Sequence, residues 1–190
     1  MTKQKVISNS ADKVLREIED LSGKKFLPII GPNRGKFLVD EVKKAKPKRI
    51  LEVGTLVGYS AILMGKELDE TSEITTIEIH RDEAEVASEN ILRAKIRPKV
   101  QVIAGDATKV IPALNGTFSF AFIDAEKTEY FQYLKLAEGK LLASSIVVAD
   151  NAGIFANQMR DYLDYVRNSG KYQSRFIQVG DDGLEISLKT

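Results

Sequence analysis

Cysteine is absent from the 190 residues, and histidine occurs only once. Without thiols the chain can form neither a disulfide nor a thiolate metal site, and a single histidine makes the usual kinds of zinc site unexpected. No apolar run approaches the roughly 20 residues of a membrane span, and the first residues lack the apolar core of a signal peptide. We therefore expect a cytoplasmic protein with no membrane contact.

An excess of charge of one sign is also missing. The 28 Lys and Arg residues nearly balance the 27 Asp and Glu residues, so the net charge is +1. The chain therefore lacks the overall positive charge that would indicate a nucleic-acid partner. Hydrophobic residues make up 43% of the chain, which is enough for one sizeable core. We predict a single domain over residues 1–190.

Short apolar runs alternate with amphipathic segments along most of the chain. The runs are RILEV, EITTIEI, KVQVIAG, FSFAFID and SIVVAD. The segments with helical spacing cover residues 11–21, 37–45, 59–68, 82–94, 108–114 and 130–142. This alternation predicts an α/β fold with a parallel sheet and helices on both faces. At the end, YQSRFIQV and GLEISLK meet at GDDG, which predicts an antiparallel hairpin at one edge of that sheet.

A carboxylate, an amide or a glycine follows each apolar run. In open α/β sheets, ligands bind outside the carboxyl ends of the strands, so these are the residues to inspect. Acidic residues also cap helices without any ligand, but five strand ends that agree favour a binding site. The residues concerned are Glu52, Gly54, Glu78, Gly105, Asp106, Asp124, Asp150 and Asn151.

The stretch LEVGTLVGYS joins the first apolar run to a helix through two glycines. Gly54 and Gly58 allow a tight turn and leave room for a ligand near the backbone. Glu78 ends the next run, where its carboxylate can accept hydrogen bonds from both hydroxyls of a ribose. The stretch lacks the third glycine of the dinucleotide pattern. A ligand with one nucleoside is therefore predicted.

Three oxygen ligands follow the fourth and fifth apolar runs. Asp124 ends the fourth run, while Asp150 and Asn151 end the fifth. Neighbouring parallel strands would bring these side chains together, and hard oxygen donors in this number suit Mg²⁺. Lys127 lies three residues beyond Asp124, within reach of the same point, and is our candidate general base.

These motifs together resemble a known family. LEVGTLVGYSA, TTIEI, AGDA, FIDAEKTEYFQYL and VVADNAG stand in the order and spacing of the cation-dependent O-methyltransferases related to catechol and caffeoyl-CoA O-methyltransferases. The resemblance implies a Rossmann-like class I methyltransferase fold with a seven-stranded, mostly parallel sheet that ends in an antiparallel hairpin. It also implies S-adenosylmethionine as methyl donor and a divalent cation such as Mg²⁺.

The resemblance further assigns roles by position. Glu78 would bind the ribose, and Asp106 and Ala107 would border the adenine. Tyr59 is predicted either to stack beside the donor or to pack in the core. The full set that would line the donor site is Ile30, Glu52, Gly54, Tyr59, Ser60, Glu78, Asp106, Ala107 and Asp124.

The catalytic and metal-binding residues carry over in the same way. Asp124, Asp150 and Asn151 would hold the metal, and Lys127 would act as the base, with Asp124 as the second catalytic residue. Phe176 stands where catechol methyltransferases of animals have the glutamate that contacts the catechol hydroxyl. The resemblance therefore implies a small catechol-like or other vicinal-oxygen acceptor without identifying it.

Two other functions compete with this hypothesis. One is O-methylation of a hydroxylated uridine in tRNA, as in some bacterial relatives, for which the basic cluster of residues 43–49 could contact phosphates. The other is a non-catalytic module that only binds the donor. We also expect residues 1–46 to form a helical segment beside the acceptor pocket. The apolar stripe of Val14, Leu15 and Ile18 suggests a homodimer.

Overall fold

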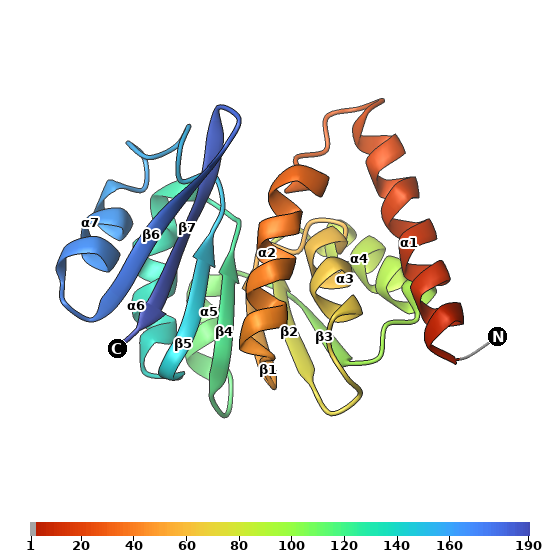
Figure 1. The fold of residues 1–190 in the computed structure, drawn as a ribbon, viewed down its shortest axis with the longest axis horizontal. Coiled ribbons are helices and arrows are strands. Elements are labelled where there is room, and N and C mark those ends of the chain that lie inside the picture. The colour runs from red at the N-terminus through yellow and green to blue at the C-terminus, as the bar shows by residue number, and fades with distance from the viewer. Residues whose placement is uncertain (1–2) are drawn as a thin grey trace.

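A seven-stranded sheet with helices on both faces forms the whole molecule (Figure 1). The computed structural model describes residues 3–190, with side chains described from residue 10 onward. The strands are β1 (Arg49–Val53), β2 (Glu73–Glu78), β3 (Lys99–Ala104), β4 (Phe118–Ile123), β5 (Leu141–Ala149), β6 (Tyr172–Val179) and β7 (Asp182–Lys189).

The strand order is β3-β2-β1-β4-β5-β7-β6. Strands β1 to β5 pair in parallel, whereas β7 runs antiparallel to both β5 and β6. The chain moves outward from β1 to β3, then returns to β4 on the other side of β1, so the topological switch point lies between β1 and β4. This arrangement confirms the predicted Rossmann-like fold and its C-terminal hairpin.

Two helical layers bury two hydrophobic cores, one on each face of the sheet. Helices α1 to α4 contribute to one core, which includes Leu38, Ile62 and Phe122, while α5 to α7 contribute to the other, which includes Ile111, Tyr130 and Tyr162. The helices are α1 (Lys3–Ser22), α2 (Gly31–Ala45), α3 (Tyr59–Lys66), α4 (Arg81–Ala94), α5 (Ala107–Ala113), the short 3₁₀ helix η1 (Lys127–Glu129), α6 (Tyr130–Glu138) and α7 (Arg160–Asn168).

Helix α2 begins six residues earlier than its apolar spacing predicted. Glycine and proline in IIGPNRG are typical of a break between helices, but Pro32 stands in the first turn of α2, where no backbone N–H is needed. The correction places Arg34 on α2 rather than in a loop. Helix α1 likewise extends beyond its predicted start, to Lys3.

The boundary between α6 and β5 also differs from the prediction. Helix α6 ends at Glu138, not at residue 142, because Leu141 already belongs to β5 and pairs with Phe118 of β4. Ser144, with φ 63°, marks an irregularity that precedes the regular part of β5. Helix α7 was not predicted at all, although Tyr162, Leu163 and Val166 bury one of its faces.

The apolar stripe of α1 packs inside the chain. Val14, Leu15 and Ile18 are each at most 5% exposed and belong to the core shared with α2 and α3. The stripe is therefore not available to a second copy, and the homodimer stays a prediction without this support. Within residues 3–190, no helix is both long and apolar enough to cross a membrane.

Candidate active site

A cavity of about 1050 Å³ opens at the carboxyl ends of β1, β2 and β4. Its walls also include the loop before α2, the N-terminus of α5, the loop after β5 and the turn between β6 and β7. The cavity thus lies at the topological switch point, where open α/β sheets bind their ligands. Of the predicted site residues, Gly54, Glu78, Asp106, Ala107, Asp124, Lys127 and Asn151 line it.

Gly54 is required where β1 meets β4. Its φ is +93°, and a Cβ built on it would stand 2.0 Å from the carbonyl oxygen of Asp124. Gly58, with φ +86°, packs in the same way against the backbone of Ala87 on α4. The prediction gave these glycines both to a tight turn and to a ligand's approach, and their positive φ values and close backbone neighbours agree with the turn. Gly54 still lines the cavity.

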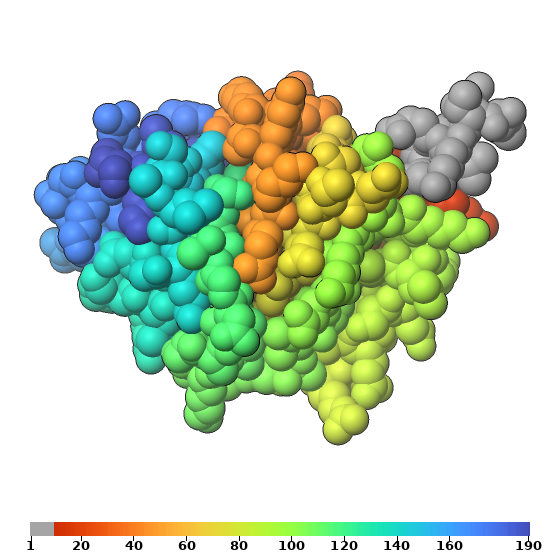
Figure 2. Space-filling model, turned by 90° about the horizontal axis from the view of Figure 1, so that it is seen from below, coloured from red at the N-terminus to blue at the C-terminus, as the bar shows by residue number. Residues whose placement is uncertain are grey.

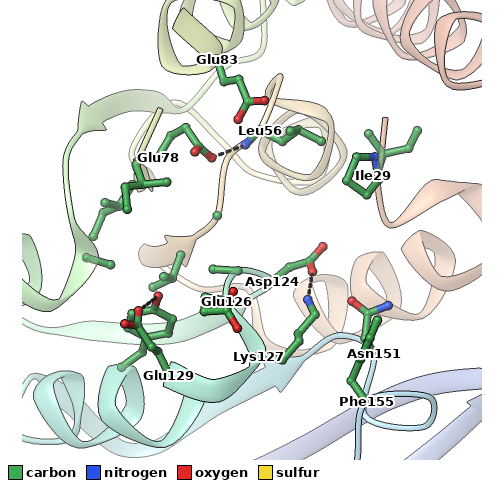
Figure 3. Close-up of a pocket in the computed structure, with 18 of the residues that line it drawn as sticks. Ile29, Leu56, Glu78, Glu83, Asp124, Glu126, Lys127, Glu129, Asn151 and Phe155 are labelled. Carbon is green, nitrogen blue, oxygen red and sulfur yellow. Dashed lines mark hydrogen bonds and ion pairs between the residues drawn. The ribbon is translucent and has the colours of Figure 1, made fainter. Parts of the chain in front are cut away.

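The Glu78 carboxylate is fixed at one end of the cavity by three backbone amides. Its Oε2 accepts hydrogen bonds from the N–H groups of Thr55 (3.2 Å) and Leu56 (2.8 Å), and its Oε1 accepts one from His80 (3.0 Å). Figure 3 shows the bond to Leu56, with Glu83 nearby. Oε2 thus already accepts two hydrogen bonds, whereas Oε1 accepts one and keeps a lone pair for a further donor such as a hydroxyl.

Glu78, His80 and Glu83 form an acidic group at this end. Among the described residues it is the one set of three or more His, Asp or Glu side chains with ligand atoms within 4.8 Å of one another. Burial, followed by the Glu78 charge, raises the pKa of Glu83. The negative charge here favours hydrogen-bond donors such as ribose hydroxyls over phosphates.

Asp106 and Ala107 border the cavity at the start of α5. The Asp106 carboxylate caps that helix, because its Oδ1 accepts hydrogen bonds from Thr108 N (2.8 Å) and Thr108 Oγ1 (2.6 Å). These bonds, together with Lys109, lower the pKa of Asp106. Asp106 therefore has a structural role as a cap and also stands where the resemblance places the adenine.

Four predicted donor-site residues lie behind the cavity wall. Ile30 is buried in the core, and its neighbour Ile29 lines the cavity instead. Tyr59 lines a separate cavity of about 300 Å³ between α1, α2 and α3, where its hydroxyl donates to Glu19 at 2.5 Å. Ser60 is also buried.

Glu52 is the fourth of these residues and is 0% exposed. Burial raises the pKa of Glu52 to about 7, although the nearby hydroxyls of Ser60 and Thr76 act in the opposite direction. Neither carboxylate oxygen has a hydrogen-bond partner of good geometry among the described residues. Glu52 thus supports the floor beneath the site without lining it.

Asp124 and Lys127 meet at the opposite end of the cavity from Glu78. The Lys127 Nζ donates to Asp124 Oδ1 at 2.9 Å (Figure 3). It also donates to the hydroxyl of Tyr130 at 2.8 Å. The fully buried Tyr130 hydroxyl in turn donates to the backbone oxygen of Asp150 at 3.4 Å. Lys127 is therefore held in place by two partners, and 15% of its side chain remains exposed.

Asp150 and Asn151 follow β5, next to Asp124, and two residues missed by the sequence analysis contact them. Arg34 forms an ion pair with Asp150, and Asp182 accepts a hydrogen bond from Asn151 Nδ2 at 2.7 Å. Burial and the negative charge of Asp124 raise the pKa of Asp150, and the positive charge of Arg34 partly offsets this rise. Arg34 and Asp150 are 116 residues apart, so no local pattern indicates their pairing.

The donor set has the chemistry that a divalent cation requires. Asp124, Asp150 and Asn151 all offer oxygen atoms, and the repulsion between the two carboxylates would be relieved by a bound cation. Because Asp182 holds the Asn151 amide nitrogen, the amide oxygen is turned toward Lys127 (Figure 3). These three residues fit a hard cation such as Mg²⁺ once Asp150 is released from Arg34.

The chain matches known proteins over most of its length. The model of the O-methyltransferase family matches residues 5–168. Catechol O-methyltransferase B of Danio rerio is 33% identical over 84% of this chain and 64% of its own length. Catechol O-methyltransferase of Niastella koreensis is 38% identical over 64% of this chain and 57% of its own length. The chain thus spans less than two thirds of the length of these relatives.

A solved structure agrees with this result. The O-methyltransferase from Bacillus cereus in complex with SAH has a TM-score of 0.82 and 25% sequence identity, and the match covers 94% of this chain and 91% of that one. The family model, the relatives and the shared fold confirm the resemblance that the motifs indicated. The chain belongs to the O-methyltransferase family.

Proposed function

We propose that the chain transfers a methyl group from S-adenosylmethionine to a hydroxyl of a small acceptor with two adjacent oxygens, assisted by Mg²⁺. One observation carries the proposal. A single cavity has a carboxylate suited to ribose at one end and, at the other, a lysine beside Asp124 and Asn151, with the buried Asp150 directly before Asn151 in the chain. A donor and an acceptor bound at these two ends would face each other.

The donor half of the cavity rests on Glu78. S-adenosylmethionine, when bound, supplies an electrophilic methyl group whose carbon–sulfur bond breaks with the electron pair going to sulfur. The remaining lone pair of Glu78 Oε1 would accept a hydrogen bond from a ribose hydroxyl, and the backbone amides of Thr55, Leu56 and His80 hold the carboxylate in the orientation needed. The preorganised carboxylate reduces the cost of ordering the site on binding.

The catalytic half rests on Lys127 and Asp124. Mg²⁺ bound by Asp124, Asp150 and Asn151 would supply positive charge that stabilises an ionised acceptor oxygen. Lys127 would receive the proton of the acceptor hydroxyl, and its contacts with Asp124 and Tyr130 fix the position of its amine. The acceptor oxygen then attacks the methyl carbon. Holding both reactants in this geometry supplies much of the rate enhancement.

The acceptor would also contact apolar side chains at the mouth of the cavity. Phe26 is 92% exposed, and Pro28 and Ile29 line the cavity next to it. Ile154 and Phe155, after β5, line it too. The segment before α2 therefore contributes to this half of the cavity, in keeping with the role expected of residues 1–46, and its side chains suit a small planar acceptor.

The tRNA alternative gains no support from the structure. The basic cluster of residues 43–49 spans the end of α2 and the start of β1, at the end of the sheet that Figure 2 faces and opposite the cavity. Several of its side chains pair with acids: Lys43 with Glu67, Lys44 with Glu41, and Lys48 with Asp69. RNA held there would not reach Lys127.

A methyl-transfer assay tests the proposal. Purified protein would receive S-adenosylmethionine with a labelled methyl group, and the acceptors would be a panel of catechols and, separately, total tRNA. Each would be assayed with Mg²⁺ and with EDTA. We expect transfer to at least one catechol in Mg²⁺ only. Transfer to tRNA alone would favour the alternative, and donor binding without transfer to any acceptor would favour a non-catalytic module.

A further inference from the structure

The positively charged side chain of Arg34 forms an ion pair with Asp150, one of the predicted metal ligands. Its Nε lies 2.7 Å from Asp150 Oδ1, and its Nη2 donates to Asp150 Oδ2 at 3.1 Å. One guanidinium therefore lies against both oxygens of the carboxylate, with a hydrogen bond to Oδ2 and a close ion pair with Oδ1 that lacks hydrogen-bond geometry. The Asp150 side chain is only 1% exposed, so no other side of it is open to solvent.

Asp182 holds Arg34 from the other side. Its Oδ2 lies 3.4 Å from Arg34 Nη1, and its Oδ1 accepts hydrogen bonds from the N–H groups of Gly153 and Ile154, both at 3.1 Å. Asn151 also donates to Asp182. Arg34 thus bridges the carboxylate of a predicted metal ligand and a second carboxylate that the backbone fixes in place.

We propose that Arg34 is a built-in counterion of Asp150 that a divalent cation must displace, so that Arg34 sets the affinity of the site for the cation. This inference rests on the proposed metal site. The Arg34 guanidinium and a divalent cation would compete for the same lone pairs of the Asp150 carboxylate. Their positive charges would also repel each other if both contacted that carboxylate. A cation that binds only after the pair opens has its apparent affinity reduced by the fraction of molecules in the open state.

The surroundings of Arg34 allow it to move. Its side chain is 22% exposed, whereas that of Asp150 is almost fully buried, so the arginine rather than the aspartate can turn toward solvent. Asp182 remains as a partner for the displaced guanidinium. Arg34 stands in the first part of α2, directly after the segment that lines the acceptor half of the cavity.

A titration with Mn²⁺ tests the inference, with the free ion followed by electron paramagnetic resonance. Wild-type protein would be compared with Arg34→Gln, and Lys36→Gln would serve as the control because Lys36 is an exposed cation on the same helix. We expect Arg34→Gln to bind Mn²⁺ about tenfold more tightly or better, since the guanidinium charge no longer occupies the Asp150 carboxylate. Lys36→Gln should stay within about twofold of wild type, the change expected from a distant surface charge.

Equal or weaker Mn²⁺ binding by a folded Arg34→Gln protein would overturn the inference and leave the metal site standing. Absence of Mn²⁺ binding by wild type and Arg34→Gln alike would instead remove the metal site from the proposed function, and the inference with it. Arg34→Lys keeps the charge but loses the planar guanidinium that lies against both carboxylate oxygens, so it should bind Mn²⁺ with intermediate affinity. This variant decides the question if Arg34→Gln does not fold, and wild-type affinity in Arg34→Lys would then count against the inference.

Discussion

At the scale of single residues, the site combines carboxylates in opposite electrostatic environments. Glu78 has three backbone N–H donors, whereas Glu52, on the neighbouring strand β1 and behind the cavity wall, has no well-formed hydrogen bond among the described residues. Desolvation disfavours the ionised form of a carboxylate, and hydrogen bonds favour it. Burial therefore raises the pKa of Glu52 to about 7, which makes Glu52 a source of pH-dependent stability.

We predict that the free energy of unfolding of wild type falls as the pH rises, and that Glu52→Gln does not show this fall. The folded-state pKa is about 7 against 4.5 for an exposed glutamate, so the contribution of Glu52 is fully present below pH 4.5 and is lost as the pH rises through 7. Between about pH 5 and pH 8, the contribution of Glu52 to the free energy of unfolding should fall by roughly 2–3 kcal/mol. Urea unfolding of both proteins at these two pH values measures it.

Glu89→Gln, on the exposed face of α4, is the matched control for this experiment. It should leave the difference in unfolding free energy between the two pH values unchanged. If Glu52→Gln showed the same pH dependence as wild type, the carboxyl would not change protonation in this range.

We predict that Lys127→Ala lowers turnover by roughly 10²–10⁴-fold at neutral pH, the usual contribution of a general base. Activity should recover partly at about pH 9, because the acceptor hydroxyl then ionises without help. A pH–rate profile on the best acceptor of the panel measures both effects. Lys135→Ala, whose amine contacts Glu138 on the outside of α6, is the control. Loss of activity without any recovery at high pH would argue against the role of Lys127 as base.

How far single residues could be predicted depended on where their partners lie. Asp124, Lys127 and Asn151 follow apolar runs, and the sheet brings such ends together, so the sequence alone placed them at one site. Arg34 and Asp182 stand 148 positions apart and follow no recognisable motif. The side of α3 on which Tyr59 lies depends on packing against α1, which the glycine motif does not determine.

At the scale of elements, the ends of β1 and β4 are in direct contact. Asp124 N donates to Val53 O, and the missing Cβ of Gly54 leaves room for the Asp124 carbonyl. This close approach sets where the Asp124 side chain enters the cavity. A side chain at position 54 would push the two strand ends apart.

We predict that Gly54→Ala destabilises the fold more than Gly170→Ala does. Both glycines have a positive φ, +93° and +74°, and a residue with a Cβ is strained there by roughly 1–3 kcal/mol. Only at Gly54 would the new Cβ also meet backbone, at 2.0 Å, whereas nothing lies within 4 Å at Gly170. Chemical denaturation should show an additional loss of about 2 kcal/mol or more at Gly54. Equal losses would mean that the strand ends separate at little cost.

Elements with a strong apolar signal were predicted well, and weaker ones were not. The runs in β1 to β4 and the hairpin of β6 and β7 have the periodicity that their burial requires. Helix α7 was missed because it is mostly polar and depends on a few side chains such as Tyr162 and Val166. The start of α2 was placed too late because a proline usually indicates the end of a helix. Pro32, however, stands in the first turn of α2, where a proline is tolerated.

At the scale of the whole molecule, the switch point between β1 and β4 brings two half-sites into one cavity. Glu78 reaches it from the end of β2, Asp124 from the end of β4 and Asn151 from the end of β5, where the buried Asp150 precedes Asn151. The strand order therefore separates the Glu78 end, which we propose binds the nucleoside, from an end rich in oxygen ligands. The central claim is that the second end acts on the acceptor and not on the donor.

Asp150→Ala tests this claim most directly, because Asp150 follows β5, farther than Asp124 from the Glu78 end. The measurement is turnover on the best acceptor in saturating Mg²⁺, together with the calorimetric dissociation constant of S-adenosylmethionine. We predict that turnover falls by roughly 10²-fold or more while donor affinity changes by less than about threefold. Unchanged turnover, or a loss of donor affinity as large as the loss of turnover, would contradict the account.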